Sequence, residues 1–179
     1  MAYAIIVPEK TMATDLGSLN VSVVSGSALE NGDVFTLHTI SGSTGYSEVF
    51  YVVAPTAGSL SGLYMAYAPE VVTVLSGTTK YKGIDQDPRN FRSAAGDVVD
   101  AFKPMVGDII LMSEDAFTGA KSTNTHANSG EGMQLVWGTT QVASSLCFKY
   151  LATDYIVIGS GSAIGDTRVT AYRMLCIAN

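Results

Sequence analysis

Residues 79–117 read TKYKGIDQDPRNFRSAAGDVVDAFKPMVGDIILMSEDAF and hold the densest mixture of charged, aromatic and turn-forming residues in the chain. A long helix over 90–102 is disfavoured, because Gly96 interrupts it and two β-branched valines follow. The sequence Val-Gly-Asp at 106–108 predicts a turn into a buried strand at 109–112. This stretch therefore predicts short strands joined by turns, and nothing in it resembles an active site.

The rest of the chain repeats this pattern of short apolar runs separated by turn residues. Asn31-Gly32 supplies the positive φ angles of a tight turn, so we expect residues 19–40 to form a β-hairpin. We predict an all-β fold: a single β-sandwich or β-barrel-like domain with short turns and at most one or two short helical turns. Further strands are expected within residues 47–55, 63–75, 133–137, 145–151, 155–158 and 168–177.

The chain is long enough for one domain with a substantial hydrophobic core. Residues 1–15 are expected to form an extended N-terminal arm or a first strand, and residues 16–179 a single β-rich domain. Within that domain, residues 118–132 (TGAKSTNTHANSGEG) predict a mobile polar loop. If the arm contacts a neighbouring subunit, its deletion is expected to weaken assembly without unfolding the domain.

Composition limits the class of partner. Charged residues make up 15% of the chain, below the roughly 25% typical of soluble domains, so much of the surface is neutral. Such a surface is expected where a partner or further copies of the chain cover it. A net charge of −6 and a pI near 4.7 argue against binding to nucleic acid or to an anionic membrane surface. We expect no signal peptide and no membrane span, since no apolar run approaches about 18 residues.

Three motifs with possible chemistry have simpler structural explanations. The pair Asp85 and Asp87 offers two carboxylates to a cation, but the remaining ligands of a calcium loop are missing, so an Asp-Pro turn is preferred. The run at 155–166 (YIVIGSGSAIGD) begins like a dinucleotide fingerprint, yet β-rich sequence follows it instead of a helix. The two histidines, His38 and His126, accompany no nucleophile motif. We predict no catalytic residue, no metal and no cofactor.

Two further sets of residues leave alternatives open. Cys147 and Cys176 each lie in an apolar strand-like run, which favours two buried thiols over a disulfide. Trp137 and the tyrosines are able to form a sugar-stacking platform, although aromatic residues in strands more often fill a core or an interface. We single out Tyr81, Phe91, Phe102 and Pro104 as interface or packing anchors.

Several short motifs in residues 27–117 resemble head decoration (cement) proteins of tailed bacteriophages that infect Gram-positive hosts. The motifs are an ENG turn, a strand ending in PTA, a strand before PE, and a block AG…RAY…GDI…S. They lie here at 30–32, 55–57, 69–70, 95–96, 100–102, 107–109 and Ser113. The chain departs from the family pattern at two positions, with Asp100 in place of Arg and Phe102 in place of Tyr.

The resemblance implies a non-enzymatic virion protein that decorates the icosahedral capsid and stabilises it by binding the major capsid protein. It implies a location on the outer surface of the virion, after assembly in the host cytoplasm, and a homo-oligomer on the capsid. A low-charge, turn-rich β scaffold suits many weak contacts repeated by symmetry. Two alternatives remain: a phage tail-tube or tail-tip subunit, which should polymerise by itself, and a carbohydrate-binding β-sandwich module.

Overall fold

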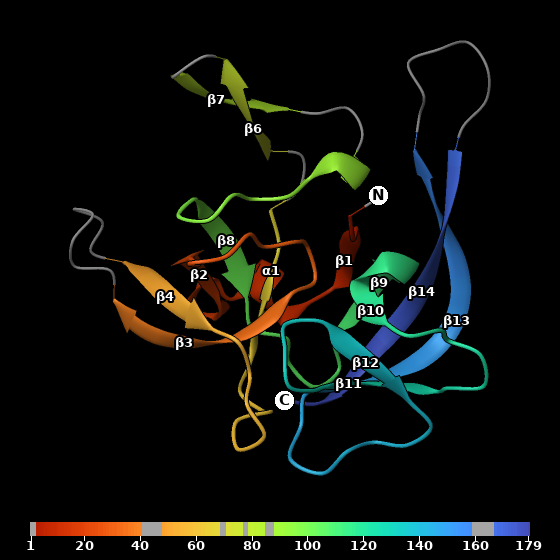
Figure 1. Cartoon of the computed structure of the whole chain (residues 1–179). Coiled ribbons are helices and arrows are strands. Elements are labelled where there is room, and N and C mark those ends of the chain that lie inside the picture. Colours follow the sequence, from red (N-terminus) through yellow and green to blue (C-terminus); the bar gives the residue numbers. More distant parts are fainter. Residues whose placement is uncertain (1–2, 41–47, 69–70, 77–78, 85–87, 159–166) are drawn as a thin grey trace.

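The computed structural model describes residues 3–40, 48–68, 71–76, 79–84, 88–158 and 167–179. Strands dominate these residues, which confirms the predicted all-β class. Figure 1 shows a small barrel beside a larger sheet, with two hairpins that extend away from this body. The tyrosine singled out at position 81 lies in one of these hairpins.

Five short strands form a closed barrel in the order β2-β4-β3-β5-β8. β2 pairs parallel with β4 and antiparallel with β8, and β5 pairs antiparallel with β3 and β8. Alternate side chains point inward and bury a small apolar core that includes Val23, Phe35 and Val99. The strands are β2 (Asn20–Val24), β3 (Val34–Ile40), β4 (Val49–Val53), β5 (Tyr64–Ala66) and β8 (Val98–Phe102).

Seven strands form the larger sheet, in the order β1-β9-β14-β13-β11-β12-β10. A separate hairpin, β6 (Val71–Ser76) with β7 (Thr79–Ile84), pairs with neither sheet. The strands of the large sheet are β1 (Ile6–Lys10), β9 (Ile109–Ser113), β10 (Phe117–Thr118), β11 (His126–Ser129), β12 (Leu135–Gly138), β13 (Cys147–Ile158) and β14 (Thr167–Ala178).

Helical structure is limited to short turns, although the described residues contain four of them where the sequence predicted at most two. They are α1 (Met12–Asp15), η1 (Gly17–Leu19), η2 (Pro88–Asn90) and η3 (Glu114–Ala116). Across the described ranges, no helix has the length and hydropathy needed to cross a bilayer.

The barrel and the large sheet share one hydrophobic core. Val34, Met65 and Phe102 of the barrel strands pack in the same buried cluster as Ile110 and Met174 of the sheet. Each such side chain contributes about 1.5–3 kcal/mol when it is removed from water. This common core therefore holds the two sheets together.

The N-terminal residues form a strand of this body rather than a detached arm. β1 pairs antiparallel with β9, and Ile6 is buried in the shared core. The Ile5 N–H also donates to Ser113 Oγ at 2.9 Å. Of the two sequence alternatives, the first strand is the one observed. Deletion of residues 1–12 is consequently expected to expose the core and destabilise the fold, which corrects the expectation that the domain tolerates it.

The predicted hairpin over residues 19–40 is wrong, although its turn exists. β2 and β3 are not neighbours, since β4 lies between them in the barrel order. Gly32 has the expected positive φ of 88°, and a Cβ there would lie 3.2 Å from Ile6 Cγ2. The glycine is therefore required for close approach of this turn to β1, and not for strand pairing across it.

Three turns share one construction that sequence inspection missed. Residues 30–33, 94–97 and 105–108 each end in Gly-Asp, and the glycines have φ of 88°, 83° and 102°. In each turn the Asp N–H donates to the carbonyl three residues earlier, at 3.2, 3.1 and 3.0 Å. The Asp carboxylate accepts the N–H of that same earlier residue, at 2.8, 3.1 and 2.8 Å. These turns directly precede β3, β8 and β9.

Residues 118–132, predicted as one mobile loop, contain β11 instead. β11 pairs antiparallel with both β12 and β13, and Asn128 and Ser129 are buried. Asn128 accepts the Val142 N–H at 2.9 Å, and Ser129 Oγ donates to the Leu60 carbonyl at 2.7 Å. Small polar residues are accommodated inside the sheet because their side chains find partners there.

Asn179 connects the barrel to the end of the large sheet. Its Oδ1 accepts the Leu63 N–H at 2.8 Å. Its Nδ2 donates to the carbonyls of Leu63 at 3.0 Å and Pro104 at 2.8 Å. One side chain thus satisfies three backbone groups from two other segments.

We predict that Asn179→Ala lowers the free energy of unfolding by about 2–3 kcal/mol, because three hydrogen bonds are lost at once. Urea unfolding monitored by circular dichroism measures the change. Asn124→Ala is the control, since the half-buried side chain of Asn124 donates only to the Ala120 carbonyl, in a solvent-exposed hydrogen bond, and a change within about 0.5 kcal/mol is expected. Equal effects of the two substitutions would contradict a role for Asn179 as a connector.

Candidate interaction surfaces

The four predicted anchors do not form one surface. Phe91 and Phe102 are each only 3% exposed, and Pro104 is buried as well. The Phe102 ring packs edge-on against Tyr67 with centroids 6.1 Å apart. These three residues therefore pack inside the protein, which is the packing alternative left open by the sequence. Tyr81 lies in β7 opposite Val74, and its side chain lies outside the described residues.

Trp137 is not available as a sugar-stacking face. It is buried in the shared core, with ring centroids 4.6 Å from Phe117 and 5.4 Å from Tyr172. Its Nε1 is buried without a hydrogen-bond partner. The aromatic cluster thus contributes to packing, and the glycan-binding alternative loses the residue on which it depended.

The cysteines and histidines do not converge on a reactive site. Cys147 and Cys176 are free and buried, and burial raises the thiol pKa to about 11 and about 12, respectively. His38 is exposed on β3, whereas His126 lies in β11 and contacts Thr125 Oγ1 and the Thr139 carbonyl. Among the described residues, no group of three or more His, Cys, Asp or Glu is close enough to hold a metal ion.

Two of the sequence motifs lie outside the described residues: the Asp85/Asp87 pair and the glycine-rich run at 159–166. The strands that flank the second motif are informative. β13 and β14 pair antiparallel up to Ile158 and Thr167. A dinucleotide-binding unit needs a helix after the glycines, and β14 stands there instead, as the sequence predicted.

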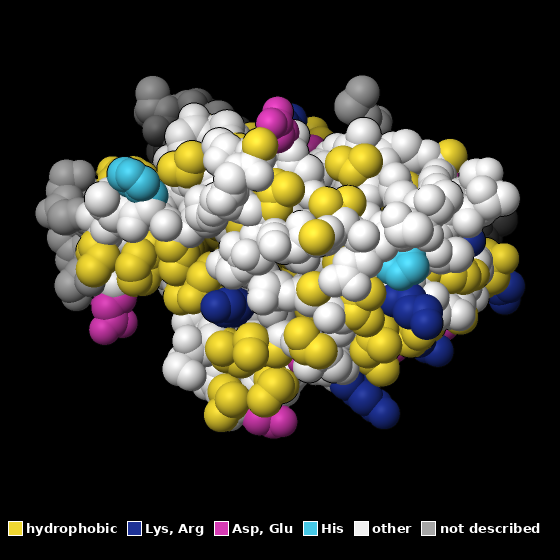
Figure 2. Space-filling model, turned by 90° about the horizontal axis from the view of Figure 1, so that it is seen from below, with side chains coloured by type: hydrophobic (Ala, Val, Ile, Leu, Met, Phe, Trp, Pro, Cys, Tyr) yellow, Lys and Arg dark blue, Asp and Glu magenta, His cyan; other side chains and the backbone are white. Residues whose placement is uncertain are grey.

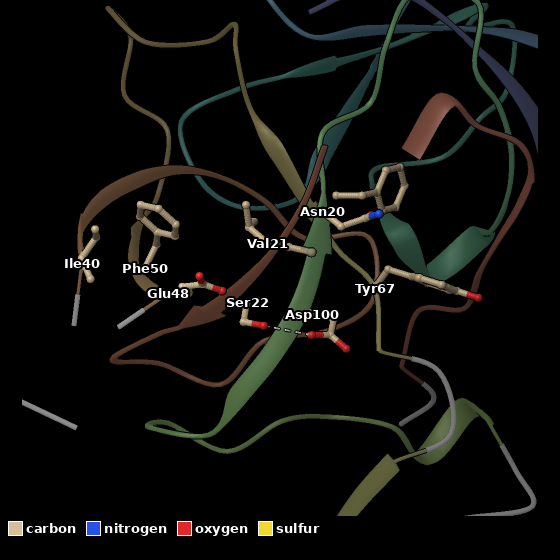
Figure 3. A pocket seen from close by; sticks show the side chains of 10 residues that line it. Asn20, Val21, Ser22, Ile40, Glu48, Phe50, Tyr67 and Asp100 are labelled. Carbon is tan, nitrogen blue, oxygen red and sulfur yellow. Dashed lines mark hydrogen bonds between the residues drawn. The ribbon is translucent and has the colours of Figure 1, made fainter. Parts of the chain in front are cut away.

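A groove of about 680 Å³ runs along the barrel beside β2 and β8 (Figure 3). Glu48 and Asp100 are the carboxylates among its lining residues, and Phe50, Tyr67 and Phe102 are aromatic. Ser22 Oγ donates to Asp100 Oδ1 at 3.3 Å. No histidine lines the groove, so this pair lacks the base of a catalytic triad. Glu48 and Asp100 together make the groove acidic.

One face of the molecule has few charges. Figure 2 shows hydrophobic side chains in several patches between neutral polar atoms, with only scattered basic and acidic groups. This agrees with the low charge content of the sequence. Large apolar side chains that are exposed on the described surface include Val106 and Val142.

The end of the β13–β14 hairpin leaves the large sheet as a two-stranded ribbon, which we define as residues 155–158 with 167–170 (Figure 1). β11 covers β13 only at 147–149, and β9 covers β14 only at 171–175. Two-stranded ribbons are marginally stable in water by themselves. The ribbon is therefore a part of the large sheet with little support from neighbouring strands.

Exposed apolar side chains alternate along β13. Tyr155 and Val157 are 53% and 54% exposed, and alternate residues of a strand share one face. Leu151 is also 43% exposed, but it lies in the bulge between Tyr150 and Ala152, where the alternation of faces shifts. The nearby charges are paired: Arg173 bonds Asp154 at 2.9 Å and Glu9 at 2.8 and 2.9 Å. β13 thus presents an apolar strip, with the exposed Arg168 of β14 directly opposite Val157.

The sequence indicated strand structure at this surface, but the prediction divided one strand into two. Sequence reasoning predicted two strands, at 145–151 and 155–158, where the structure has one strand of 12 residues. Thr153 and Asp154 were treated as a break because both residue types are common in turns and Asp is depleted in strands. Pairing with β14 overrides that local preference.

A buried carboxylate lies at the entrance to the barrel. Asp33 is 8% exposed, and its Oδ2 accepts the Glu30 N–H at 2.8 Å. Burial raises the pKa of Asp33 to about 6, and the nearby Glu30 charge adds to the rise, while Arg92 opposes it. The charged form of Asp33 is therefore costly in the folded protein at neutral pH.

Compared with known proteins, the chain matches no protein-family model, and it matches no curated protein and no solved structure at a significant level. The resemblance of residues 27–117 to phage decoration proteins therefore stays a hypothesis.

We predict that Asp33→Asn removes a pH dependence of stability. The folded pKa of about 6 lies above the ordinary value of 3.8. The carboxyl therefore contributes fully to stability below pH 3.8, and this contribution is lost as the pH rises through about 6. Urea unfolding between about pH 4 and about pH 7 should show the wild type losing about 2–3 kcal/mol relative to Asp33→Asn.

Asp97→Asn is the matched control for this experiment. Asp97 accepts the N–H of Ala94 in the same type of turn but is less buried. It is expected to follow the wild-type pH profile. If Asp33→Asn also follows that profile, burial of Asp33 does not govern the pH dependence.

Proposed function

We propose that this chain is a non-enzymatic structural protein of a tailed phage virion. In this proposal it decorates the outer surface of the icosahedral capsid and stabilises the shell by binding the major capsid protein. The observation that carries the proposal is the apolar strip on β13, which projects with the ribbon beyond the body of the molecule. The motifs in residues 27–117 that resemble those of decoration proteins suggest that the partner of this strip is a phage capsid.

The exposed side chains of β13 suit attachment to a protein surface. Leu151, Tyr155 and Val157 offer apolar area that gains free energy when it leaves water, at about 25 cal/mol per Å². Interface cores are depleted in charge and enriched in tyrosine, as this strip is. A weak contact of this kind suffices when symmetry repeats it over a shell.

A tail-tube or tail-tip subunit remains the second candidate within phage structural proteins. The separate β6–β7 hairpin and the ribbon are both elements that subunits of a tube are able to exchange. The two functions differ in the behaviour of the free protein. A tube subunit forms rings or filaments, whereas a decoration protein stays a small oligomer until a capsid is present.

We predict that the purified protein co-sediments saturably with phage heads assembled without their decoration protein, and that decorated heads resist heating better than bare heads. The double variant Leu151→Asn, Val157→Asn is expected to bind at least about tenfold more weakly, because two apolar contacts are lost. The measurements are occupancy per head against protein concentration and the temperature of head disruption.

Val106→Asn, Val142→Asn is the matched control, since it removes two exposed valines away from the ribbon. It is expected to bind heads like the wild type. Equal loss in both double variants would indicate a general effect of surface apolarity. Absence of saturable binding, with rings or filaments formed by the protein alone, would favour the tail subunit.

A further inference from the structure

The outer edge of β13 has no strand beside it over most of its length. β11 pairs with β13 at 147–149, and beyond that point the described strands leave one side of Ala152–Ile158 unpaired. An open edge presents a row of backbone N–H and C=O groups that is ready to pair with another strand. Proteins usually protect such edges.

The usual protection is weak here. Ala152–Ile158 contains no proline, and its one charged residue is Asp154. The Asp154 carboxylate is already held by Arg173 at 2.9 Å and by the Tyr155 N–H at 2.8 Å. Its charge is therefore partly compensated by Arg173, which it shares with Glu9. The bulge between Tyr150 and Ala152 lies at one end of the segment and leaves the rest regular.

The open edge of β14 is a poorer site for pairing. It spans only 167–170 before β9 covers the strand. Arg168 is exposed on it, and a basic residue on an edge strand disfavours pairing with another chain. Strand addition is therefore favoured at β13.

We propose that the free edge of β13 pairs antiparallel with the same edge of a second copy of this chain. A two-fold axis perpendicular to the sheet puts one residue opposite itself, and Tyr155 is the centre of Ala152–Ile158. Pairing about Tyr155 uses the whole free edge and joins two ribbons into one four-stranded sheet.

The side chains are self-complementary in this register. Tyr155 faces Tyr155 of the second copy, and aromatic cross-strand pairs are favourable. Thr153 faces Val157 of the second copy, a pair of β-branched residues. Asp154 faces Ile156 and so does not meet another carboxylate. Where the Tyr155 N–H turns to the second copy, its carbonyl replaces the Asp154 oxygen as the acceptor.

Pairing at the edge also enlarges the apolar patch on the face of β13. It brings Tyr155 and Val157 of both copies onto one side of a single sheet. The apolar strip of each copy thereby becomes half of a larger patch. A role of that patch in binding the capsid rests on the proposed function, whereas the pairing of two copies does not.

The register is tested by cross-linking single cysteine variants of the free protein. Tyr155→Cys is expected to form a covalent dimer rapidly on mild oxidation or with a short thiol-specific linker, because residue 155 faces itself. Val157→Cys is the control: its side chain is equally exposed, yet its two copies lie about 13 Å apart along the strands. The buried Cys147 and Cys176 do not compete.

The pairing is tested by a charge exchange. Wild-type protein is expected to sediment as a dimer, and Tyr155→Lys and Tyr155→Glu each to self-associate at least about tenfold more weakly, since like charges then face each other. A mixture of the two variants should restore a one-to-one dimer. Thermal unfolding of each variant checks that its fold is kept.

Three results would overturn the proposal: a monomeric wild type, an oligomer that both charge variants retain, or equal cross-linking at positions 155 and 157. None of these experiments contains a capsid. A dimer that fails to bind heads therefore refutes the proposed function alone, and a monomer that binds heads refutes this pairing alone.

Discussion

A glycine with positive φ, followed by an aspartate whose carboxylate caps the turn, is the local interaction on which this architecture depends. It starts β3, β8 and β9. β8 closes the barrel against β2 and β5, and β9 joins β1 to β14. Each turn satisfies its own backbone groups, so it can be placed against the core. Asp108 also accepts the Met12 N–H and thereby holds α1 in place.

The same Gly-Asp turn is electrostatically unfavourable where its carboxylate is buried with no cation in contact. Asp108 accepts two backbone N–H groups, from Met12 and Met105. Asp33 accepts one and lies close to Glu30, and burial raises its pKa. Arg92 approaches Glu30 only to 3.8 Å from a largely exposed position. One turn motif therefore has different electrostatic consequences at different depths.

The body of the molecule uses its large side chains internally, which directs attention to the ribbon. Phe91, Phe102 and Trp137 are buried, and Asn179 is engaged with two other segments. In contrast, β13 extends beyond its neighbours with exposed apolar residues on one face and an open edge on one side. The face of β13 offers apolar side chains, whereas its edge offers backbone N–H and C=O groups. A single strand can therefore contact a shell through its face and another copy through its edge.

The sequence by itself determined the all-β class, the turns at Gly32 and Gly107, and the buried state of the two cysteines. These features follow from local preferences, because a glycine at positive φ or a β-branched run acts over a few residues. Sequence reasoning did not find the neighbours of each strand. β2 pairs with β4 instead of β3, and β11 forms in a stretch of small polar residues.

Only the tertiary structure decided which side chains are free to bind a partner. Aromatic residues look alike in sequence whether they fill a core or an interface, so Phe102 and Trp137 were open to both readings. Their burial depends on contacts with segments far away in the chain, such as Tyr172 beside Trp137. The ribbon was likewise hidden, because an open strand edge is defined by the end of its neighbour, β11, and not by its own residues.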